Sequence, residues 1–554
     1  MSRTYLVGDL VADFLERCGV NTAFGIISIH NIPILDAMAN RNAIRFVMAR
    51  GEMGAGHMAD AYARVTGGLS VLVTSTGPGA ANAAPALVEA RFAASPLLHI
   101  TGQTATRFAD RVMGTVHDVP DQLGMLKSIG KAAYRVRSAQ EAFGILTKAA
   151  VEALTPPRGP VTVEIPIDIQ RTAVTRPSGF ESFALRLPEP LKPSSSDIKA
   201  LADAVMMARR PMLWLGNGAR DAGPIAVRLL GLGFRTVTSW NGRGIVPEDD
   251  ERSLGALNGL GMPDIQAFYE TVDLMIVAGS RLRGHETFDF TVKLPDNLIQ
   301  IDIDPMANGR TYPARQFVLG DSAATLGALA DVIAGRMKVD PNFSSDFFKM
   351  RAQARSKFRN SLGPYASFPE QIRAAMPRGT TWVRDVTIAS SSWGNRLMPV
   401  FHPSENVYPV GAGIGLGLPL GVGAAVAGTG QRKTVVLTGD GGFILNMTEL
   451  WTAVQEKLDL VIVVMNDKGY GVIRQIQDAQ YGGRHCYGDL MVPDLKGVAE
   501  LAKIPFWRLS RAEELEKTMK IALDVAGPAI VEVDVSAIGA IPPYFPYDRK
   551  PKAT

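Results

Sequence analysis

Two stretches decide the fold of this chain: Thr438-Gly439-Asp440-Gly441-Gly442 and Met465-Asn466-Asp467-Lys468-Gly469-Tyr470. Each follows a short apolar run, at 435–437 and 460–464, and such runs are typical of buried parallel strands. A helix-like stretch at 447–457 lies between the two runs. The sequence therefore predicts a strand–loop–helix–strand unit with a carboxylate after one strand and an amide after the next.

These residue types suit a metal-bound phosphate. Ligands of open α/β sheets bind at the carboxyl ends of the strands. The side-chain oxygens of Asp440 and Asn466 are ligands that Mg²⁺ accepts, usually together with phosphate oxygens. Gly441 and Gly442 would let backbone N–H groups approach a phosphate closely. The alternative is a pair of unrelated glycine turns with no ligand.

The paired motif resembles that of the thiamine diphosphate (ThDP) enzymes, in the group of acetolactate synthase, benzaldehyde lyase and benzoylformate decarboxylase. A second stretch, Arg50-Gly51-Glu52-Met53-Gly54-Ala55-Gly56-His57-Met58-Ala59-Asp60-Ala61-Tyr62-Ala63-Arg64, resembles the glutamate motif of that family. There a carboxylate opens a helix of small residues that packs closely. Glu52 follows an apolar run at 44–49, so we expect it at a helix N-terminus. An ordinary helix-start glutamate stabilised by the helix dipole is the alternative.

The resemblance implies a catalytic role for Glu52. In the family this glutamate hydrogen-bonds the pyrimidine N1′ and favours the imino tautomer of the 4′-amino group, which takes the C2 proton of the cofactor. A carboxyl group in apolar surroundings has a raised pKa, which would let Glu52 share a proton near neutral pH.

The resemblance also implies the other cofactor contacts. Mg²⁺ would be bound by Asp440, Asn466 and the backbone carbonyl of Lys468. The Ala412 carbonyl would accept from the 4′-amino group, and Ile414 would hold the two rings in their bent conformation. The remaining contacts would come from Pro78, Asn82, Thr387, Ile388, Gly439, Gly441, Gly442, Gly469 and Tyr470. A plain strand-end turn at 387–388 and a glycine-rich helix start at 78–82 are the structural alternatives.

Three further residues are expected to face the reacting carbon. His30 falls where benzaldehyde lyase also carries a histidine, and His117 falls where many relatives carry glutamine. A histidine at the second position could relay protons near neutral pH, although a lone loop histidine also serves structural roles. Val472 would limit the space beside C2, which favours a compact acyl group.

Composition excludes several classes of protein. The 554 residues are 46% hydrophobic and 20% charged, as in ordinary globular proteins. The net charge is only +4, without a basic stripe or RNA-binding motif, so nucleic acid is not expected as a partner. Cys18 and Cys486 give neither a disulfide framework nor a cysteine metal site. Without a membrane-length apolar run or a signal-peptide pattern, we expect a cytoplasmic protein that does not bind membranes.

The expected fold class is α/β, with three doubly wound parallel-sheet domains, because strand and helix signals alternate along most of the chain. The predicted boundaries are 1–175 for a pyrimidine-binding domain, 176–197 for a linker, 198–335 for a central α/β domain, 336–364 for a second linker, 365–541 for a diphosphate-binding domain, and 542–554 for a C-terminal tail. The aromatic, proline-rich tail would form a lid or pack on a neighbour.

The family layout implies an oligomer with shared active sites. ThDP would lie between the pyrimidine domain of one subunit and the diphosphate domain of another, so Glu52 and Asp440 of one site would belong to different chains. A homodimer is the minimum, and a homotetramer is common among such enzymes.

The expected function is that of a ThDP- and Mg²⁺-dependent carbon–carbon lyase or ligase similar to acetolactate synthase. It would decarboxylate a 2-oxo acid, or join or cleave 2-hydroxy ketones, through an enamine at C2 of the cofactor. Its substrates would be a small 2-oxo acid or an aldehyde.

Three alternatives stay open. A 2-hydroxyacyl-CoA or oxalyl-CoA lyase would need a basic pocket for the CoA phosphates. A flavin-linked oxidoreductase of the pyruvate oxidase type would need FAD in the central domain. The stretches at 216–220 and 279–283 resemble acetolactate synthase but lack the acidic run after the second arginine, so FAD is doubtful. A degenerate binding protein would have no need of Glu52, Asp440 and Asn466 together.

Overall fold

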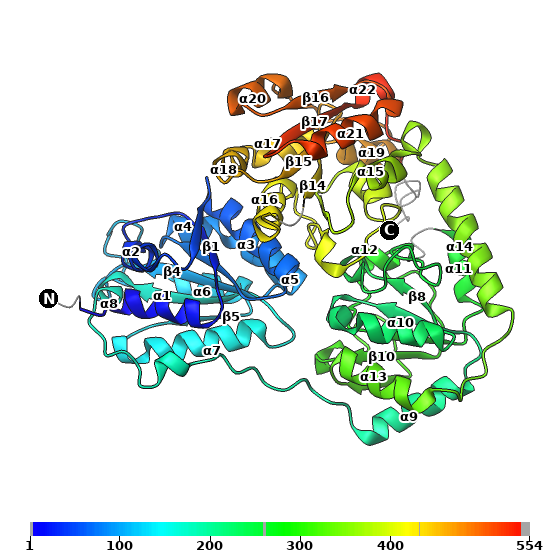
Figure 1. Cartoon of the computed structure of the whole chain (residues 1–554), viewed down its shortest axis with the longest axis horizontal. Coiled ribbons are helices and arrows are strands. Elements are labelled where there is room, and N and C mark those ends of the chain that lie inside the picture. The colour runs from blue at the N-terminus through cyan, green and yellow to red at the C-terminus, as the bar shows by residue number, and fades with distance from the viewer. Residues whose placement is uncertain (1–3, 259–261, 431–432, 544–554) are drawn as a thin grey trace.

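The structure is a computed structural model that describes residues 4–258, 262–430 and 433–543. Three parallel sheets, each packed between helices, follow one another along the chain, and Figure 1 shows them as three lobes. The expected α/β class with three parallel-sheet domains is confirmed. The tail expected to form a lid falls mostly at 544–554, outside the described residues.

The first domain has a six-stranded sheet in the order β2-β1-β3-β4-β6-β5. Its strands are β1 (Thr22–Gly25), β2 (Arg45–Met48), β3 (Ser70–Thr74), β4 (Leu97–Gln103), β5 (Ala132–Arg135) and β6 (Val161–Pro166). Its helices are α1 (Val7–Arg17), α2 (Ile32–Arg41), α3 (Glu52–Thr66), α4 (Pro78–Asn82), α5 (Ala84–Ala93), α6 (Gln122–Ile129), α7 (Ala142–Leu154) and α8 (Ile167–Gln170). A long connection then leads to the central domain (Figure 1).

The central domain has a five-stranded sheet in the order β11-β10-β9-β7-β8. Its strands are β7 (Pro211–Leu215), β8 (Arg235–Thr238), β9 (Leu274–Ala278), β10 (Leu298–Asp302) and β11 (Gln316–Leu319). Its helices are α9 (Ser195–Met207), α10 (Gly223–Gly231), α11 (Pro263–Tyr269), α12 (Gly284–Thr287) and α13 (Ser322–Ile333). The long helix α14 (Phe343–Asn360) runs along the side of the molecule toward the third domain (Figure 1).

The third domain has a six-stranded sheet in the order β13-β12-β14-β15-β17-β16. Its strands are β12 (Thr381–Arg384), β13 (Asn406–Val407), β14 (Thr434–Gly439), β15 (Leu460–Asn466), β16 (Phe506–Leu509) and β17 (Ala529–Asp534). Its helices are α15 (Phe368–Ala375), α16 (Gly417–Ala427), α17 (Asp440–Leu445), α18 (Glu449–Gln455), α19 (Gly471–Gln480), α20 (Leu495–Ala502), α21 (Leu515–Asp524) and α22 (Val535–Ile538). The two deciding stretches lie at the ends of the neighbouring strands β14 and β15.

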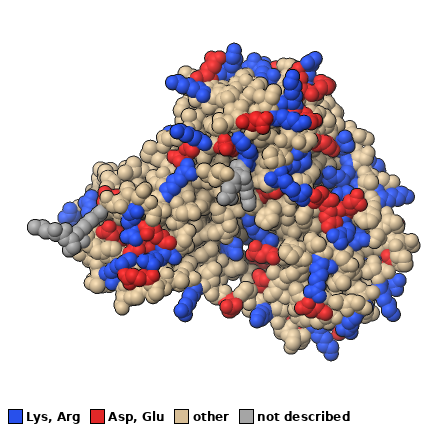
Figure 2. Space-filling model, viewed as in Figure 1, with Lys and Arg blue, Asp and Glu red and all other residues tan. Residues whose placement is uncertain are grey.

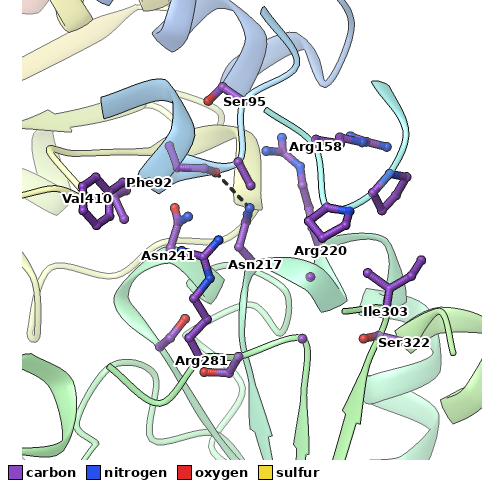
Figure 3. Close-up of a pocket in the computed structure, with 18 of the residues that line it drawn as sticks. Phe92, Ser95, Arg158, Asn217, Arg220, Asn241, Arg281, Ile303, Ser322 and Val410 are labelled. Carbon is purple, nitrogen blue, oxygen red and sulfur yellow. Dashed lines mark hydrogen bonds between the residues drawn. The ribbon is translucent and has the colours of Figure 1, made fainter. Parts of the chain in front are cut away.

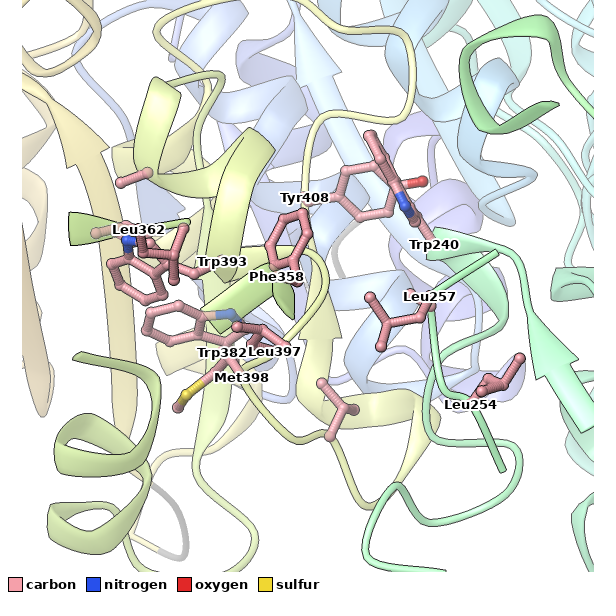
Figure 4. Packing of buried hydrophobic residues seen from close by; sticks show 14 of the residues in the cluster. Trp240, Leu254, Leu257, Phe358, Leu362, Trp382, Trp393, Leu397, Met398 and Tyr408 are labelled. Atoms are coloured by element: carbon pink, nitrogen blue, oxygen red, sulfur yellow. The ribbon is translucent and has the colours of Figure 1, made fainter. Parts of the chain in front are cut away.

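Apolar side chains join the domains as well as filling them. One buried cluster combines Trp240 and Leu257 of the central domain with Trp382 and Trp393 of the third, and Phe358 of α14 lies between them (Figure 4). Burying this much aromatic surface stabilises the arrangement of the two domains as well as each core.

Helix α3 of the first domain packs directly on α16 of the third. The contact depends on small residues, as expected from the composition of α3. A Cβ atom on Gly423 of α16 would lie 2.1 Å from the backbone oxygen of Met58. Only glycine allows the two helices to approach this closely.

Positive and negative side chains are interspersed over the face shown in Figure 2. This distribution agrees with the small net charge of +4. Within the described part of the chain, none of the helices has the length and apolar character needed to cross a membrane.

Candidate active site

The carboxyl ends of β14 and β15 place the first site residues side by side, since Gly439 pairs with Met465 across the two strands. Asp440 is the first residue of α17 and is fully buried. Its Oδ2 accepts from the N–H of Gly469 at 2.9 Å, whereas its Oδ1 has no hydrogen-bond partner among the described residues. A buried carboxylate oxygen left open in this way fits a metal ion.

Asn466 and Lys468 lie beside this carboxylate. Asn466 donates to Glu532 at 2.8 Å, and its Oδ1 accepts from the N–H of Lys468 at 3.2 Å. Lys468 adopts a φ of 57°, which turns the loop sharply, and its carbonyl accepts from Leu490 at 3.1 Å. Burial and the neighbouring Asp467 raise the pKa of Asp440 to about 7.

Glycines of this region let the loops pack so closely that a Cβ atom would touch or clash with a neighbouring loop. A Cβ on Gly441 would lie 2.8 Å from the ring of Tyr470, and one on Gly469 would lie 2.2 Å from a backbone oxygen of the adjacent 488–489 segment. A Cβ on Gly439 would lie 3.4 Å from the Thr387 methyl group. The loops after β12, β14 and β15 therefore converge on one edge of the sheet.

Asp385 ties these loops together. It is buried just after β12, and its carboxylate accepts from the N–H groups of Gly415 and Gly417 at 3.0 and 3.1 Å and from the Thr438 hydroxyl at 3.1 Å. A Cβ on Gly442 would lie 2.7 Å from the same carboxylate. Burial raises the pKa of Asp385. No role for Asp385 was predicted from the sequence.

The segment at 410–417 projects the two residues expected to contact the cofactor rings. Ala412 has a φ of 62°, a conformation that L side chains seldom adopt. The Ile414 side chain is 47% exposed although it is large and apolar. An exposed apolar side chain on a constrained loop fits a residue that contacts a ligand.

Glu52 opens α3 as expected, with Gly51 before it. Its carboxylate accepts from the Asn82 amide at 3.3 Å, and a Cβ on Gly79 would lie 2.9 Å from it. Pro78 is the first residue of α4 and Asn82 is the last. The three residues predicted to contact the pyrimidine thus lie together in the first domain.

His30 and His117 also lie together. Their ring centroids are 5.1 Å apart, and His117 has a φ of 65°. Burial and the adjacent His117 lower the pKa of His30, so its imidazole stays neutral at neutral pH. The Nδ1 atom of His117 lies 3.5 Å from the Ser75 hydroxyl.

Val472 occupies the second position of α19 and packs partly against the core shared by the central and third domains. Its neighbour Ile473 is 44% exposed. Both residues lie in the first turn of the helix that follows the Gly469-Tyr470 turn. A role for Val472 beside the reacting carbon stays a prediction.

The sequence analysis missed three buried polar residues near these motifs. Glu449 of α18 accepts from the N–H of Arg50, and its carboxylate lies where a Cβ on Gly54 would be. Gln122 accepts from the N–H of Gly77 at 2.6 Å, and Glu89 binds the 410–417 segment. For Glu89, an acid in a helix rich in small residues was the available signal, but the partners of all three residues lie far away in the sequence.

A second cavity, of about 230 Å³, lies between the first and central domains, and residues of the third domain such as Val410 close one side of it. Figure 3 shows Arg158, Arg220 and Arg281 around it, with Asn217 hydrogen-bonded to a backbone oxygen of α5. Asp302, at the end of β10, also lines the cavity, and burial raises the pKa of this carboxyl group. Arginines and carboxylates both line the cavity, and its guanidinium groups would bind the anionic part of a ligand.

Comparison with protein families assigns all three domains. The chain matches the thiamine pyrophosphate enzyme N-terminal TPP binding domain at residues 6–125, the central domain at 198–329 and the C-terminal TPP binding domain at 388–533. The chain therefore belongs to the thiamine pyrophosphate enzymes.

Individual relatives resemble the chain over nearly its whole length. A protein from Pseudomonas aeruginosa named as a probable 2-ketoarginine decarboxylase is 30% identical over 96% of this chain and 94% of its own. The acetolactate synthase isozyme 3 large subunit of Escherichia coli is 28% identical over 96% of this chain and 95% of its own. An X-ray structure from Mycobacterium smegmatis, described as that of a candidate thiamin diphosphate-dependent enzyme, has the same fold, with a TM-score of 0.79 and 23% identity over 96% of this chain and 99% of that one.

Proposed function

We propose that this chain is a ThDP- and Mg²⁺-dependent carbon–carbon lyase or ligase that decarboxylates a 2-oxo acid, or joins or cleaves 2-hydroxy ketones. The observation that carries the proposal is the buried Oδ1 of Asp440, which lacks a partner among the described residues and lies in the loop cluster of Asn466 and Lys468. The residues present fit a Mg²⁺-bound diphosphate. When bound, thiamine diphosphate supplies a carbanion that adds to a carbonyl carbon and then acts as an electron sink.

The side chains of this protein would bind the cofactor, hold it in place and transfer protons. Asp440, Asn466 and the Lys468 carbonyl would hold the metal, with Gly441 beside the diphosphate. Glu52 would hold a proton at N1′ of the pyrimidine, and Asn82, which donates to Glu52, would keep its carboxylate in place.

The side chains that would contact the substrate include the neighbouring imidazoles of His30 and His117. Burial and the adjacent His117 lower the pKa of His30, so its neutral imidazole would hydrogen-bond the substrate oxygen and pass a proton to it or take one from it. His117 lies beside it and is partly exposed, so it would connect the substrate pocket with solvent. Val472 would limit the size of the acyl group.

A second candidate function is favoured by the arginine-lined cavity between the first and central domains. A 2-hydroxyacyl-CoA or oxalyl-CoA lyase needs a basic pocket for the CoA phosphates, and Arg158, Arg220 and Arg281 supply one there. A flavin in the same cavity is the remaining alternative, and visible absorbance of the purified protein would reveal it.

The experiment that tests the proposal has two parts. Calorimetric titration of the protein with ThDP in the presence and absence of Mg²⁺ should show binding that requires the metal. A substrate panel of pyruvate, 2-ketoarginine, benzoylformate, benzoin and oxalyl-CoA, scored for CO₂ and hydroxy ketone, then separates decarboxylation, ligation and CoA chemistry. Protein that ignores ThDP with metal in excess contradicts the proposal.

We also propose the domain boundaries given above and a cytoplasmic location. The protein would form a homodimer or homotetramer with its active sites between subunits. The first and third domains each hold one half of the predicted site: Glu52, Pro78 and Asn82 in one, and Asp440, Asn466 and Lys468 in the other.

A further inference from the structure

Glu89 is a buried carboxylate to which the proposed chemistry gives no role. It lies in α5 of the first domain, and its residue is 3% exposed. Its two oxygens accept from backbone N–H groups of the third domain: Oε1 from Val410 at 2.6 Å and Oε2 from Gly411 at 2.8 Å. One side chain therefore binds two successive peptides of another domain.

A buried arginine holds Glu89 in this position. Arg64, in the last turn of α3, donates to Glu89 Oε1 at 2.8 Å and also pairs with Asp60. Its Nη1 donates to the backbone oxygen of Tyr408, just before the same segment. The first domain thus binds both an oxygen and two N–H groups of one short stretch of the third domain.

The central domain binds that stretch from another direction. Arg283 donates to the Val410 oxygen at 2.6 Å and to the Tyr408 hydroxyl at 2.9 Å. At the far end, Asp385 binds the N–H groups of Gly415 and Gly417. Between the two anchored ends, Ala412 and Ile414 project with a constrained backbone and an exposed side chain.

We propose that Glu89 is a positioning residue that fixes the 410–414 segment before the cofactor binds. The inference rests on the proposed function, because Ala412 and Ile414 matter only as ring contacts of ThDP. A segment held in its binding conformation loses less conformational entropy on binding, so the Glu89 contact would increase cofactor affinity without touching the cofactor.

The test compares Glu89→Gln with a matched control. Glutamine keeps the size of the side chain, but only its oxygen can accept, and its amide group would face a backbone N–H. Asp13→Asn serves as the control, since Asp13 is also a fully buried carboxylate of the first domain and is paired with arginines, Arg17, Arg41 and Arg176. It measures the general effect of neutralising a buried acid.

Two readouts decide the outcome. In cofactor-free protein, hydrogen exchange of the 408–414 peptide should become about tenfold faster in Glu89→Gln, because a hydrogen bond to a charged group is lost. The dissociation constant of ThDP with Mg²⁺ should rise by about tenfold, while kcat at saturating ThDP stays close to that of the wild type. Asp13→Asn should change neither quantity.

A second variant tests the same contact in case Glu89→Gln does not fold. A Cβ on Gly411 would lie 2.9 Å from Glu89 Oε2 and 3.0 Å from the Phe92 ring, so Gly411→Ala should disturb the same contact without removing a buried charge. Wild-type protein that does not bind ThDP contradicts the proposed function. Wild-type protein that binds ThDP, with unchanged ThDP affinity in the Glu89 and Gly411 variants, overturns the role of Glu89.

Discussion

At the scale of single residues, the site depends on polar groups placed where water is excluded. The open Oδ1 of Asp440, the hydrogen bonds that Asp385 accepts and the neutral ring of His30 each result from burial of a group that would otherwise be hydrated. Two predictions belong to this scale.

The first concerns Glu52. Replacement by glutamine keeps the size of the side chain and its contact with Asn82 but removes the negative charge that proton transfer requires. In Glu52→Gln we expect kcat to fall by about 10²–10⁴-fold, with ThDP affinity retained. Steady-state kinetics and calorimetry on the same preparation measure both, and near-normal turnover would disprove the assignment.

The second concerns His99, a fully buried ring between the hydroxyls of Thr74 and Thr162 at 2.9 and 3.1 Å. Burial lowers the pKa of His99 to about 3. The unfolded chain binds a proton at this residue once the pH falls below about 6.5, and the native state does not, so acid favours unfolding.

As the pH falls from about 7 to about 5, protonation of His99 in the unfolded chain should therefore lower the free energy of unfolding by about 2 kcal/mol. The His99→Gln variant should be less stable at neutral pH but should lose stability less steeply on acidification. Urea unfolding of both proteins at each pH provides the measurement. Parallel pH dependences for the two proteins would contradict the prediction.

At the scale of elements, the packing of α3 on α16 brings the glutamate motif close to the third domain. The start of α3 carries Glu52, and its last turn carries Arg64, which binds Glu89 and the Tyr408 oxygen. A single helix thus connects the predicted pyrimidine contact with the segment expected to hold the cofactor rings.

The prediction at this scale compares two helical glycines. Gly423→Ala places a methyl group against the Met58 backbone and should destabilise the protein by about 1–3 kcal/mol. Gly144 lies inside α7 with open space around its missing Cβ, so Gly144→Ala should stabilise the protein by about 0.5–1 kcal/mol. Thermal unfolding distinguishes the two variants. Equal changes in their unfolding temperatures would show that the α3–α16 contact is not tightly packed.

At the scale of the whole molecule, the predicted site is divided between domains. If two chains complete each site, ThDP with Mg²⁺ binds the dimer and favours it by mass action. We expect sedimentation to show a shift toward dimer or tetramer, and about 2.7 kcal/mol of added stability at a hundredfold excess over the dissociation constant. Removal of Mg²⁺ with EDTA should reverse both effects. A monomer that turns over substrate would contradict the shared site.

The sequence by itself determined the α/β class, the strands that carry the metal motif, and the helix start at Glu52, because these features are local: continuous apolar runs and glycine-rich turns are visible in neighbouring residues. Not every strand is apparent from the sequence, and β5 and β11 are two that are not. Both lie at sheet edges and are only partly buried, so they do not form apolar runs.

Only the tertiary structure decided which distant groups meet. Glu89 with Val410, Asp385 with Gly415, and Glu449 with Arg50 are pairs of residues from separate elements, and two of the three pairs join different domains. A buried acid in a helix does not indicate its partner by sequence spacing. The partner is set by how the sheets and helices pack, since most buried polar groups form hydrogen bonds with whatever groups the fold places beside them.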